Sequence, residues 1–232
     1  MKLKHITFTG IDGRTDLDEL CEIQQAYPIA EWGVLVAKNW KDNGNRFFNP
    51  SYLDALEDRR LNLSAHLCGS IARAAVRGDI TPFYEWSRYY YHMFNRCQLN
   101  VAASLGNPVS FDYSGQIASY FDEVILQQKS AREVPLFLNS KVSRHITCLL
   151  DASGGQGIDS PIEVLKLPHK IGYTGGINAD NVADKLSYLM ESDDVDDFWI
   201  DMESGVRTDD WFDLDKVVKV LKICSDVLKQ YK

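Results

Sequence analysis

The sequence predicts an α/β protein that folds as a single (β/α)8 TIM barrel over residues 1–232. Short apolar runs alternate with amphipathic stretches along the chain, which is typical of a parallel α/β protein. The length of 232 residues is close to that of one complete barrel. Carboxylates and glycines stand where the later apolar runs stop, and barrel enzymes gather such residues at their strand ends.

Eight apolar runs are predicted to be strands: His5–Ile11, Trp32–Ala37, Leu61–Cys68, Cys97–Ala102, Glu123–Lys129, His145–Asp151, Lys170–Gly175 and Phe198–Asp201. In several of them apolar and polar side chains alternate, as expected where one set faces the helices and the other the barrel interior. The polar set then points inward, and its last members should meet at one mouth of the barrel: Thr9, His66, Asn100, Asp151 and Asp201.

Six amphipathic stretches are predicted to be helices: Asp16–Tyr27, Pro50–Arg60, Pro82–Asn95, Ser160–Lys166, Asp180–Glu191 and Asp213–Tyr231. The first begins with acidic residues, which suit a helix N-terminus. The last carries an apolar stripe at helical spacing. Residues 130–144 contain Pro135 and show the weakest helical pattern. The aromatic stretch 83–94 is expected to pack on the barrel, with contact between copies in a homo-oligomer as the alternative.

Composition argues against several partners. The net charge of −8 and the pI of about 5.1 disfavour a nucleic-acid surface. No apolar run approaches the roughly 18 residues of a membrane span, and no signal peptide is evident. The five cysteines are widely spaced and form no CxxC pair, which disfavours a zinc site or a disulfide framework and favours a cytoplasmic protein. No metal or other cofactor is indicated.

Three glycine-rich segments follow the last strands. Gly155 lies in the segment after Asp151, Gly175 and Gly176 end the seventh strand, and Ser204 and Gly205 follow the eighth. Glycines allow a phosphate to approach backbone N–H groups, and barrels commonly bind phosphate after strands seven and eight. We therefore expect these five residues to bind the phosphate of a small substrate, with tight-turn geometry as the alternative.

Together with Thr9-Gly10, Asn45-Arg46-Phe47 and Gln98-Leu99-Asn100, these segments resemble the phosphoribosylanthranilate isomerase family of tryptophan biosynthesis. The resemblance runs from the first strand to the eighth. It implies an Amadori-type aldose–ketose isomerisation of a small phosphorylated N-glycoside, an intramolecular oxidoreduction. It further implies that Asp151 is the general acid, that Thr9 occupies the base position, and that Arg46, Asn100 and Asp201 bind substrate.

The chain departs from this family at three positions. Thr9 stands where the family has a cysteine, and a hydroxyl is a far weaker proton acceptor than a thiol near neutral pH. Asn100 replaces a histidine, and Arg207 replaces a glutamate in a place that would add positive charge near the phosphate. His66 has an ordinary pKa that suits a substitute base, although it can equally be an interior hydrogen-bonding residue.

Two other functions remain open from the sequence. The chain can be a catalytically altered or inactive relative that binds a phosphorylated metabolite or a protein partner. It can also be another barrel isomerase or an aldolase-type enzyme with a different base. Schiff-base chemistry is disfavoured because no lysine occupies a clear inward strand position.

Overall fold

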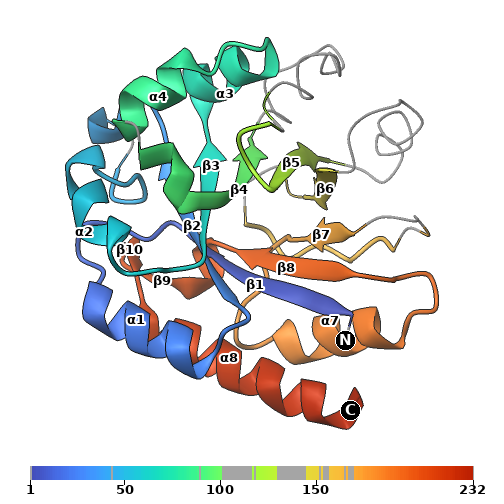
Figure 1. Ribbon diagram of the computed structural model, residues 1–232. Helices are drawn as coiled ribbons and strands as arrows, with labels where there is room; N and C mark the ends of the chain where they lie inside the picture. Colours follow the sequence, from blue (N-terminus) through green and yellow to red (C-terminus); the bar gives the residue numbers. More distant parts are fainter. Residues whose placement is uncertain are drawn as a thin grey trace.

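The computed structural model describes residues 2–42, 44–88, 90–100, 117, 119–129, 145–151, 153, 157–164, 166 and 170–231. Within them the strands form a closed parallel barrel in sequence order, in which β8 pairs with β1 (Figure 1). The strands are β1 Leu3–Thr9, β2 Ala30–Val36, β3 Leu63–Leu67, β4 Phe94–Leu99, β5 Glu123–Gln128, β6 Ile146–Leu150, β7 Ile171–Tyr173 and β8 Phe198–Met202. The predicted TIM barrel is confirmed.

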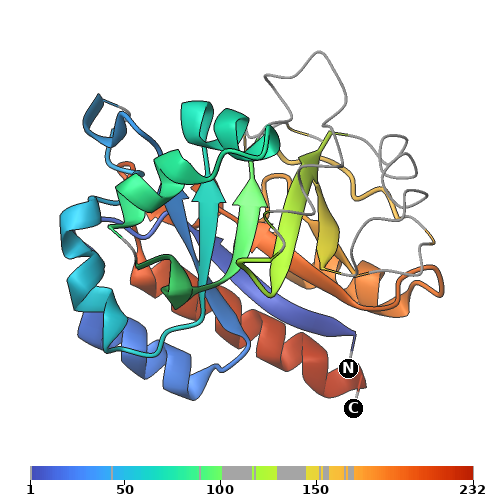
Figure 2. The same ribbon diagram turned by 45° about the horizontal axis from the view of Figure 1, so that its top comes forward.

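The described helices lie on the outside of the barrel, as Figures 1 and 2 show from two directions. They are α1 Leu17–Ala26, α2 Leu53–Glu57, α3 Gly69–Val76, α4 Thr81–Ser87, α7 Val182–Glu191 and α8 Leu214–Leu228. Asp16 and Asp213 cap α1 and α8, because each carboxylate accepts hydrogen bonds from backbone N–H groups of the first turn. No helix in the described part of the chain is long and apolar enough to cross a membrane.

Two predicted helices are wrong in part or whole. The stretch Pro82–Asn95 is helical only to Ser87, because Arg88 adopts a left-handed conformation and Phe94 already begins β4. The described residues of Ser160–Lys166 are not helical. The backbone carbonyl of Ser160 accepts a hydrogen bond from Lys185 Nζ of α7, so its partner is a side chain of another element and not a backbone N–H of the same segment. Residues 130–144 lie outside the described part.

Helix α3 was not predicted. Four of its eight residues are buried, two of them alanines, so its apolar face is short and carries little side-chain volume. The hydrophobic periodicity that reveals longer helices is therefore weak here.

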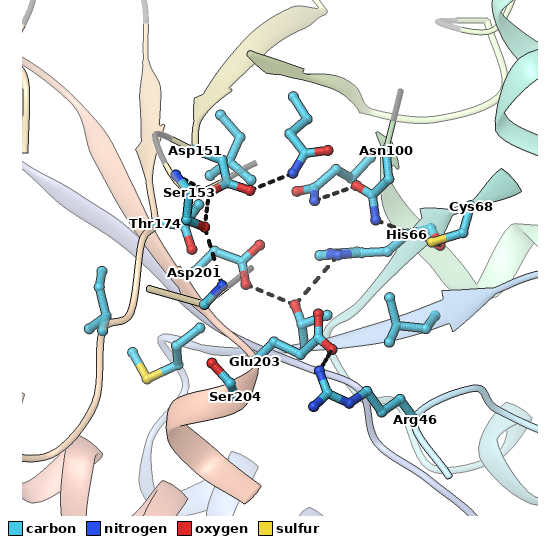
Figure 3. Close-up of a pocket in the computed structure, with 18 of the residues that line it drawn as sticks. Arg46, His66, Cys68, Asn100, Asp151, Ser153, Thr174, Asp201, Glu203 and Ser204 are labelled. Atoms are coloured by element: carbon cyan, nitrogen blue, oxygen red, sulfur yellow. Dashed lines mark hydrogen bonds and ion pairs between the residues drawn. The ribbon is translucent and has the colours of Figure 1, made fainter. Parts of the chain in front are cut away.

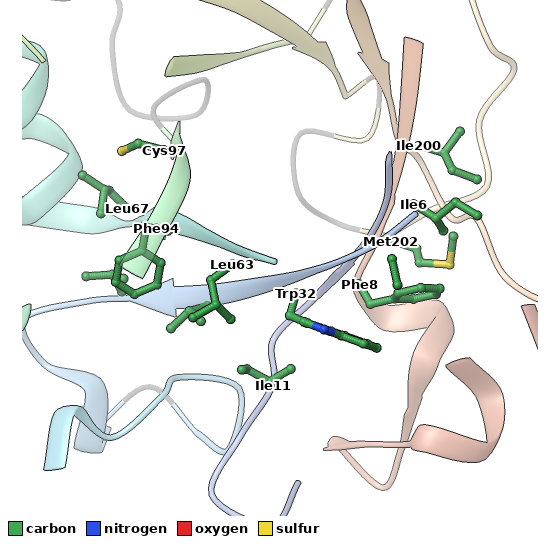
Figure 4. Packing of buried hydrophobic residues seen from close by; sticks show 14 of the residues in the cluster. Ile6, Phe8, Ile11, Trp32, Leu63, Leu67, Phe94, Cys97, Ile200 and Met202 are labelled. Carbon is green, nitrogen blue, oxygen red and sulfur yellow. The ribbon is translucent and has the colours of Figure 1, made fainter. Parts of the chain in front are cut away.

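The apolar core lies between the strands and the helices. The apolar members of the alternating strands, among them Ile6, Phe8, Leu63 and Leu67, are buried in one cluster with residues of the helices (Figure 4). Phe8 packs against Trp32, with 5.8 Å between ring centroids. This is the outward orientation that the alternation predicts.

The aromatic stretch 83–94 packs on this core with one face. Phe83, Trp86 and Phe94 are buried, and Phe83 also contacts the ring of Phe121. The packing interpretation therefore holds for these three side chains. A contact between copies of the chain stays a prediction.

The barrel interior contains a charged layer below the mouth. Arg96 on β4 binds Glu31 at 2.7 Å and Glu123 at 3.0 Å, and Thr7 and Thr147 donate to the same carboxylates. Burial opposes the ionisation of both glutamates, but the Arg96 guanidinium and the hydrogen bonds hold the pKa of each below its ordinary value. The layer closes the barrel beneath the pocket.

A small apolar cluster of Ile125, Leu149 and Trp199 also lies inside the barrel. The Trp199 ring lies 4.4 Å from the Arg96 guanidinium carbon. Gly172 on β7 makes room for this ring, since a Cβ at that position would approach it to 2.2 Å. The charged layer and this apolar cluster thus fill the barrel interior beneath the pocket. Open space remains at the carboxyl ends of the strands.

Candidate active site

A pocket of about 440 Å³ opens at the carboxyl ends of the strands (Figure 3). The strand-end residues predicted to converge all line it: Thr9, His66, Asn100, Asp151 and Asp201. Arg46, Gly176 and Ser204 line it as well, and Gly175 and Gly205 lie in the loops beside it. Gly155 falls outside the described residues. The position is where barrel enzymes build their active sites.

Thr9 joins two side chains that are far from it in sequence, Asp201 on the neighbouring strand β8 and His66 on β3. Its hydroxyl donates to Asp201 Oδ1 at 2.8 Å and lies 3.4 Å from His66 Nδ1. Gly33 on β2 gives these groups their space, because a Cβ there would lie 2.6 Å from Thr9 Oγ1 and 3.1 Å from His66 Nε2. The three residues form a buried hydrogen-bonded group at the floor of the pocket.

The protonation of this group is unusual. Burial raises the pKa of Asp201 to about 8; the bond from Thr9 opposes the rise, and the charges of Glu31 and Glu203 add to it. Burial lowers the pKa of His66 to about 4, so its imidazole is neutral at neutral pH. The sequence indicated only a substrate-binding role for Asp201, since the burial that shifts its pKa arises from tertiary packing.

Asp151 lies at the end of β6 with its carboxylate held by neutral donors. Gln127 Nε2 donates to Oδ2 at 2.6 Å, and the Ser153 hydroxyl and backbone N–H donate to Oδ1 at 2.7 and 3.1 Å. The side chain is nearly fully buried. It therefore orders the start of the following loop and also faces the pocket.

Asn100 lies on the far side of the pocket from Asp201. Its Oδ1 accepts from Gln98 Nε2 at 2.8 Å, and its Nδ2 lies 3.3 Å from Cys68 Sγ (Figure 3). Cys68 is the thiol that lines the described pocket, but burial raises its pKa to about 12. It stays protonated near neutral pH, so it does not supply the thiolate that position 9 lacks.

Arg46 stands at the rim with its guanidinium already engaged. Its NH1 donates to Glu203 Oε1 at 2.8 Å and its Nε donates to Asp210 Oδ1 at 2.6 Å. A substrate carboxylate would have to compete with both. The sequence pointed to neither acidic partner, because Asp210 reaches the site only through the turn between the short strands β9 (Arg207–Thr208) and β10 (Trp211–Phe212).

Arg207 is held by partners that do not line the pocket. Its NH2 binds Asp12 at 3.1 Å, its NH1 donates to the Gly10 carbonyl at 2.7 Å, and two of its nitrogens donate to the Asp210 carbonyl. Its guanidinium is therefore paired with Asp12, and the expected positive charge near the phosphate end stays a prediction. Within the described residues, no group of three or more His, Cys, Asp or Glu side chains could hold a metal ion.

Three loops meet where a phosphate was expected. Gly176 has a φ of 62°, and a Cβ there would lie 2.4 Å from Asp159 N. A Cβ at Gly205 would lie 2.1 Å from the Ile177 carbonyl oxygen, and one at Gly157 would lie 2.2 Å from Ser204 Oγ. The loops after β6, β7 and β8 thus touch one another through their glycines.

Replacing Gly176 with alanine is expected to cost at least about 1–2 kcal/mol of folding free energy, because its left-handed backbone disfavours a side chain. The clash with Asp159 would also separate the loops and weaken the phosphate binding that the sequence predicts there. Thermal unfolding and titration with inorganic phosphate measure both effects. Gly13→Ala is the matched control, since its Cβ would make only an ordinary contact of 3.6 Å with Tyr52. Equal behaviour of the two variants would contradict the prediction.

No protein-family model matches the chain, and no curated protein sequence matches it significantly. Solved structures do. N-(5'-phosphoribosyl)anthranilate isomerase from Pyrococcus furiosus aligns with 96% of this chain and 98% of its own, at 14% identity and a TM-score of 0.57. The isomerase from Thermococcus kodakaraensis aligns with 98% of this chain and 99% of its own, at 12% identity and a TM-score of 0.57.

A phosphoribosyl anthranilate isomerase in complex with reduced 1-(o-carboxyphenylamino)-1-deoxyribulose 5-phosphate matches equally well. It aligns over 97% of this chain and 100% of its own, at 17% identity and a TM-score of 0.60. At these identities the likeness is one of fold. The resemblance expected from the motifs is confirmed at that level.

Proposed function

We propose that this protein is an aldose–ketose isomerase that carries out an Amadori-type rearrangement of a small phosphorylated N-glycoside. The observation that carries the proposal is the arrangement of two carboxyl groups in one pocket. Asp151 lies at the end of β6, and Asp201 with Thr9 lies at the ends of β8 and β1. The reaction needs an acid at the ring oxygen and a base at C2, and this pocket presents carboxyl groups for both.

Asp151 is the proposed acid. It protonates the ring oxygen of the sugar as the C1–O bond breaks, which opens the ring and leaves an iminium at C1. Its neutral hydrogen-bond donors, Gln127 and Ser153, hold the carboxyl in one orientation without a fixed positive charge beside it. Orientation of this kind keeps the proton within reach of the ring oxygen.

The phosphate is proposed to bind at the glycine-lined loops after β7 and β8. Gly176 and Ser204 line the pocket there, so a ligand can contact both backbone and hydroxyl. The pocket volume of about 440 Å³ lies in the range of about 300–1,000 Å³ that is usual for small-molecule sites. The structural neighbour that holds a reduced aminodeoxyribulose phosphate supports the same ligand class for this fold.

The alternative function is binding of a phosphorylated metabolite without turnover. It is favoured by the hydroxyl of Thr9 in the base position and by the two carboxylates that occupy Arg46. Incubation with phosphoribosylanthranilate, followed by loss of its anthranilate fluorescence, separates the two functions. Turnover supports the isomerase. A thermal shift with the same compound and no turnover would replace it with the binding protein.

A further inference from the structure

The Thr9 hydroxyl is placed to transfer a proton. It lines the pocket, and it donates to Asp201 Oδ1 at 2.8 Å while His66 Nδ1 lies 3.4 Å away. A hydroxyl has one proton and two lone pairs, so it can accept a proton on one side while it releases its own on the other. Position 9 lacks the thiol of the isomerase family, but its hydroxyl is already bonded to the buried carboxyl group of Asp201.

We propose that Thr9 and Asp201 together are the base of this isomerase, with the Thr9 hydroxyl passing the C2 proton of the substrate to Asp201. This inference rests on the proposed function. As the C2–H bond breaks, its electron pair forms the C1=C2 bond and the C1=N pair moves onto the iminium nitrogen. The departing proton bonds to Thr9 Oγ1, and the original Thr9 proton bonds to Asp201 Oδ1. The resulting enaminol becomes the aminoketose when C1 gains a proton from solvent and the C2 hydroxyl loses one to solvent. Asp201 then releases its proton to solvent and Asp151 takes one up, which restores the starting state.

The surroundings of Asp201 make it a stronger base than an exposed aspartate. The groups around Asp201 are His5 and Thr9 on β1, Glu31 on β2, His66 on β3 and Arg96 on β4, while Glu203 lies two residues after Asp201 in the chain. Burial and the two glutamates raise the pKa of Asp201 to about 8, against the bond from Thr9 and the charge of Arg96. A base is most effective when its pKa lies near the working pH.

His66 is the positioning residue of this relay. It is fully buried and neutral, and a proton on its Nδ1 can be donated to Thr9 Oγ1. That hydrogen bond would leave the Thr9 proton free to point at Asp201. His66 therefore fixes the direction of the relay and takes no proton from the substrate.

Three full-length proteins test the relay: the wild type, Thr9→Val and the conservative Thr9→Ser. The wild-type kcat/KM is expected to rise with pH through an inflection near 8, because Asp201 must be ionised to act as the base. Thr9→Val keeps the shape of the side chain and should lower kcat by about 10²–10⁴-fold with little change in KM. Thr9→Ser should keep most of the activity.

Carbon NMR of protein labelled at the aspartate carboxyl carbons gives a readout that needs no turnover. The Asp201 signal is assigned by its absence in Asp201→Asn and is expected to titrate near pH 8 in the wild type. In Thr9→Val it should titrate at a higher pH, because the hydrogen bond that stabilises the ionised carboxylate is lost. Titration in the ordinary aspartate range, or full activity of folded Thr9→Val, would overturn the relay. Absence of turnover in the wild type would instead overturn the proposed function.

Discussion

Replacing Asp151 with asparagine is expected to lower kcat by about 10²–10⁴-fold and to leave KM nearly unchanged. The amide has the same shape as the carboxyl but cannot deliver a proton to the ring oxygen. Its oxygen can still accept the two bonds from Ser153, and the Gln127 amide can turn to accept from the new amide nitrogen. The pocket should therefore keep its shape while it loses its acid.

Steady-state kinetics with the fluorescent substrate measure this loss. Asp226→Asn is the matched control, because Asp226 is an exposed residue of α8 that pairs only with Lys229 among the contacts described. It should behave as the wild type. If Asp151→Asn kept more than a tenth of the wild-type kcat, Asp151 would not be the acid.

Replacing Arg96 with methionine is expected to destabilise the fold by about 3–5 kcal/mol, because a buried ion pair loses one partner and leaves the other charge uncompensated. Arg96 is 3% exposed, and its two partners Glu31 and Glu123 lie in the same closed layer of the barrel. The Glu31 carboxylate is fully buried, whereas Glu123 is partly exposed and keeps Lys170 as a second partner, so most of the expected cost arises at Glu31. Unfolding in urea, followed by circular dichroism, measures the change.

The pH dependence of this effect has a definite sign. In the wild type the folded-state pKa of Glu31 and of Glu123 is lowered, so their ionisation stabilises the fold above pH about 4.5 and this contribution is lost as pH falls. Without Arg96 the folded-state pKa of both glutamates should rise. Protonation of these buried carboxylates as the pH falls then stabilises the folded variant. The difference between the two proteins should therefore shrink from pH 7 toward pH 4.

Arg59→Met provides the comparison for this experiment. Arg59 pairs with Asp18 at the surface, where solvent screens the interaction. Arg59→Met should therefore lower the free energy of unfolding much less than Arg96→Met does. Equal destabilisation by both substitutions would contradict the account of the charged interior layer.

The sequence predicted the barrel and the inward residues well because both follow from periodicity. Alternation in β1 and β3 placed Thr9 and His66 on the interior side, and both line the pocket. The glycines after β7 were recognisable because their loop excludes a Cβ. These features are local, and a strand can point a side chain only to one of two faces.

The rest depends on contacts between distant parts of the chain. The sequence predicted a substrate-binding role for Arg46 but not its acidic partners. Glu203 and Asp210 are more than 150 residues away from Arg46 in sequence and bind its guanidinium in the folded protein. The raised pKa of Asp201 likewise depends on burial among residues of several strands. The pairing of Arg207 with Asp12 brings together the two ends of the barrel sequence. No local pattern contains such pairings.

Carbon NMR of a phosphorylated N-glycoside labelled at C1 tests the central claim most directly. We predict that the wild-type protein converts the glycosidic C1 signal into that of an N-linked methylene carbon, the mark of an aminoketose, and that Asp151→Asn slows this conversion by about 10²–10⁴-fold. A C1 signal that stays unchanged while the ligand remains bound, or that becomes a free sugar by hydrolysis, would contradict the assignment of this barrel as an aldose–ketose isomerase.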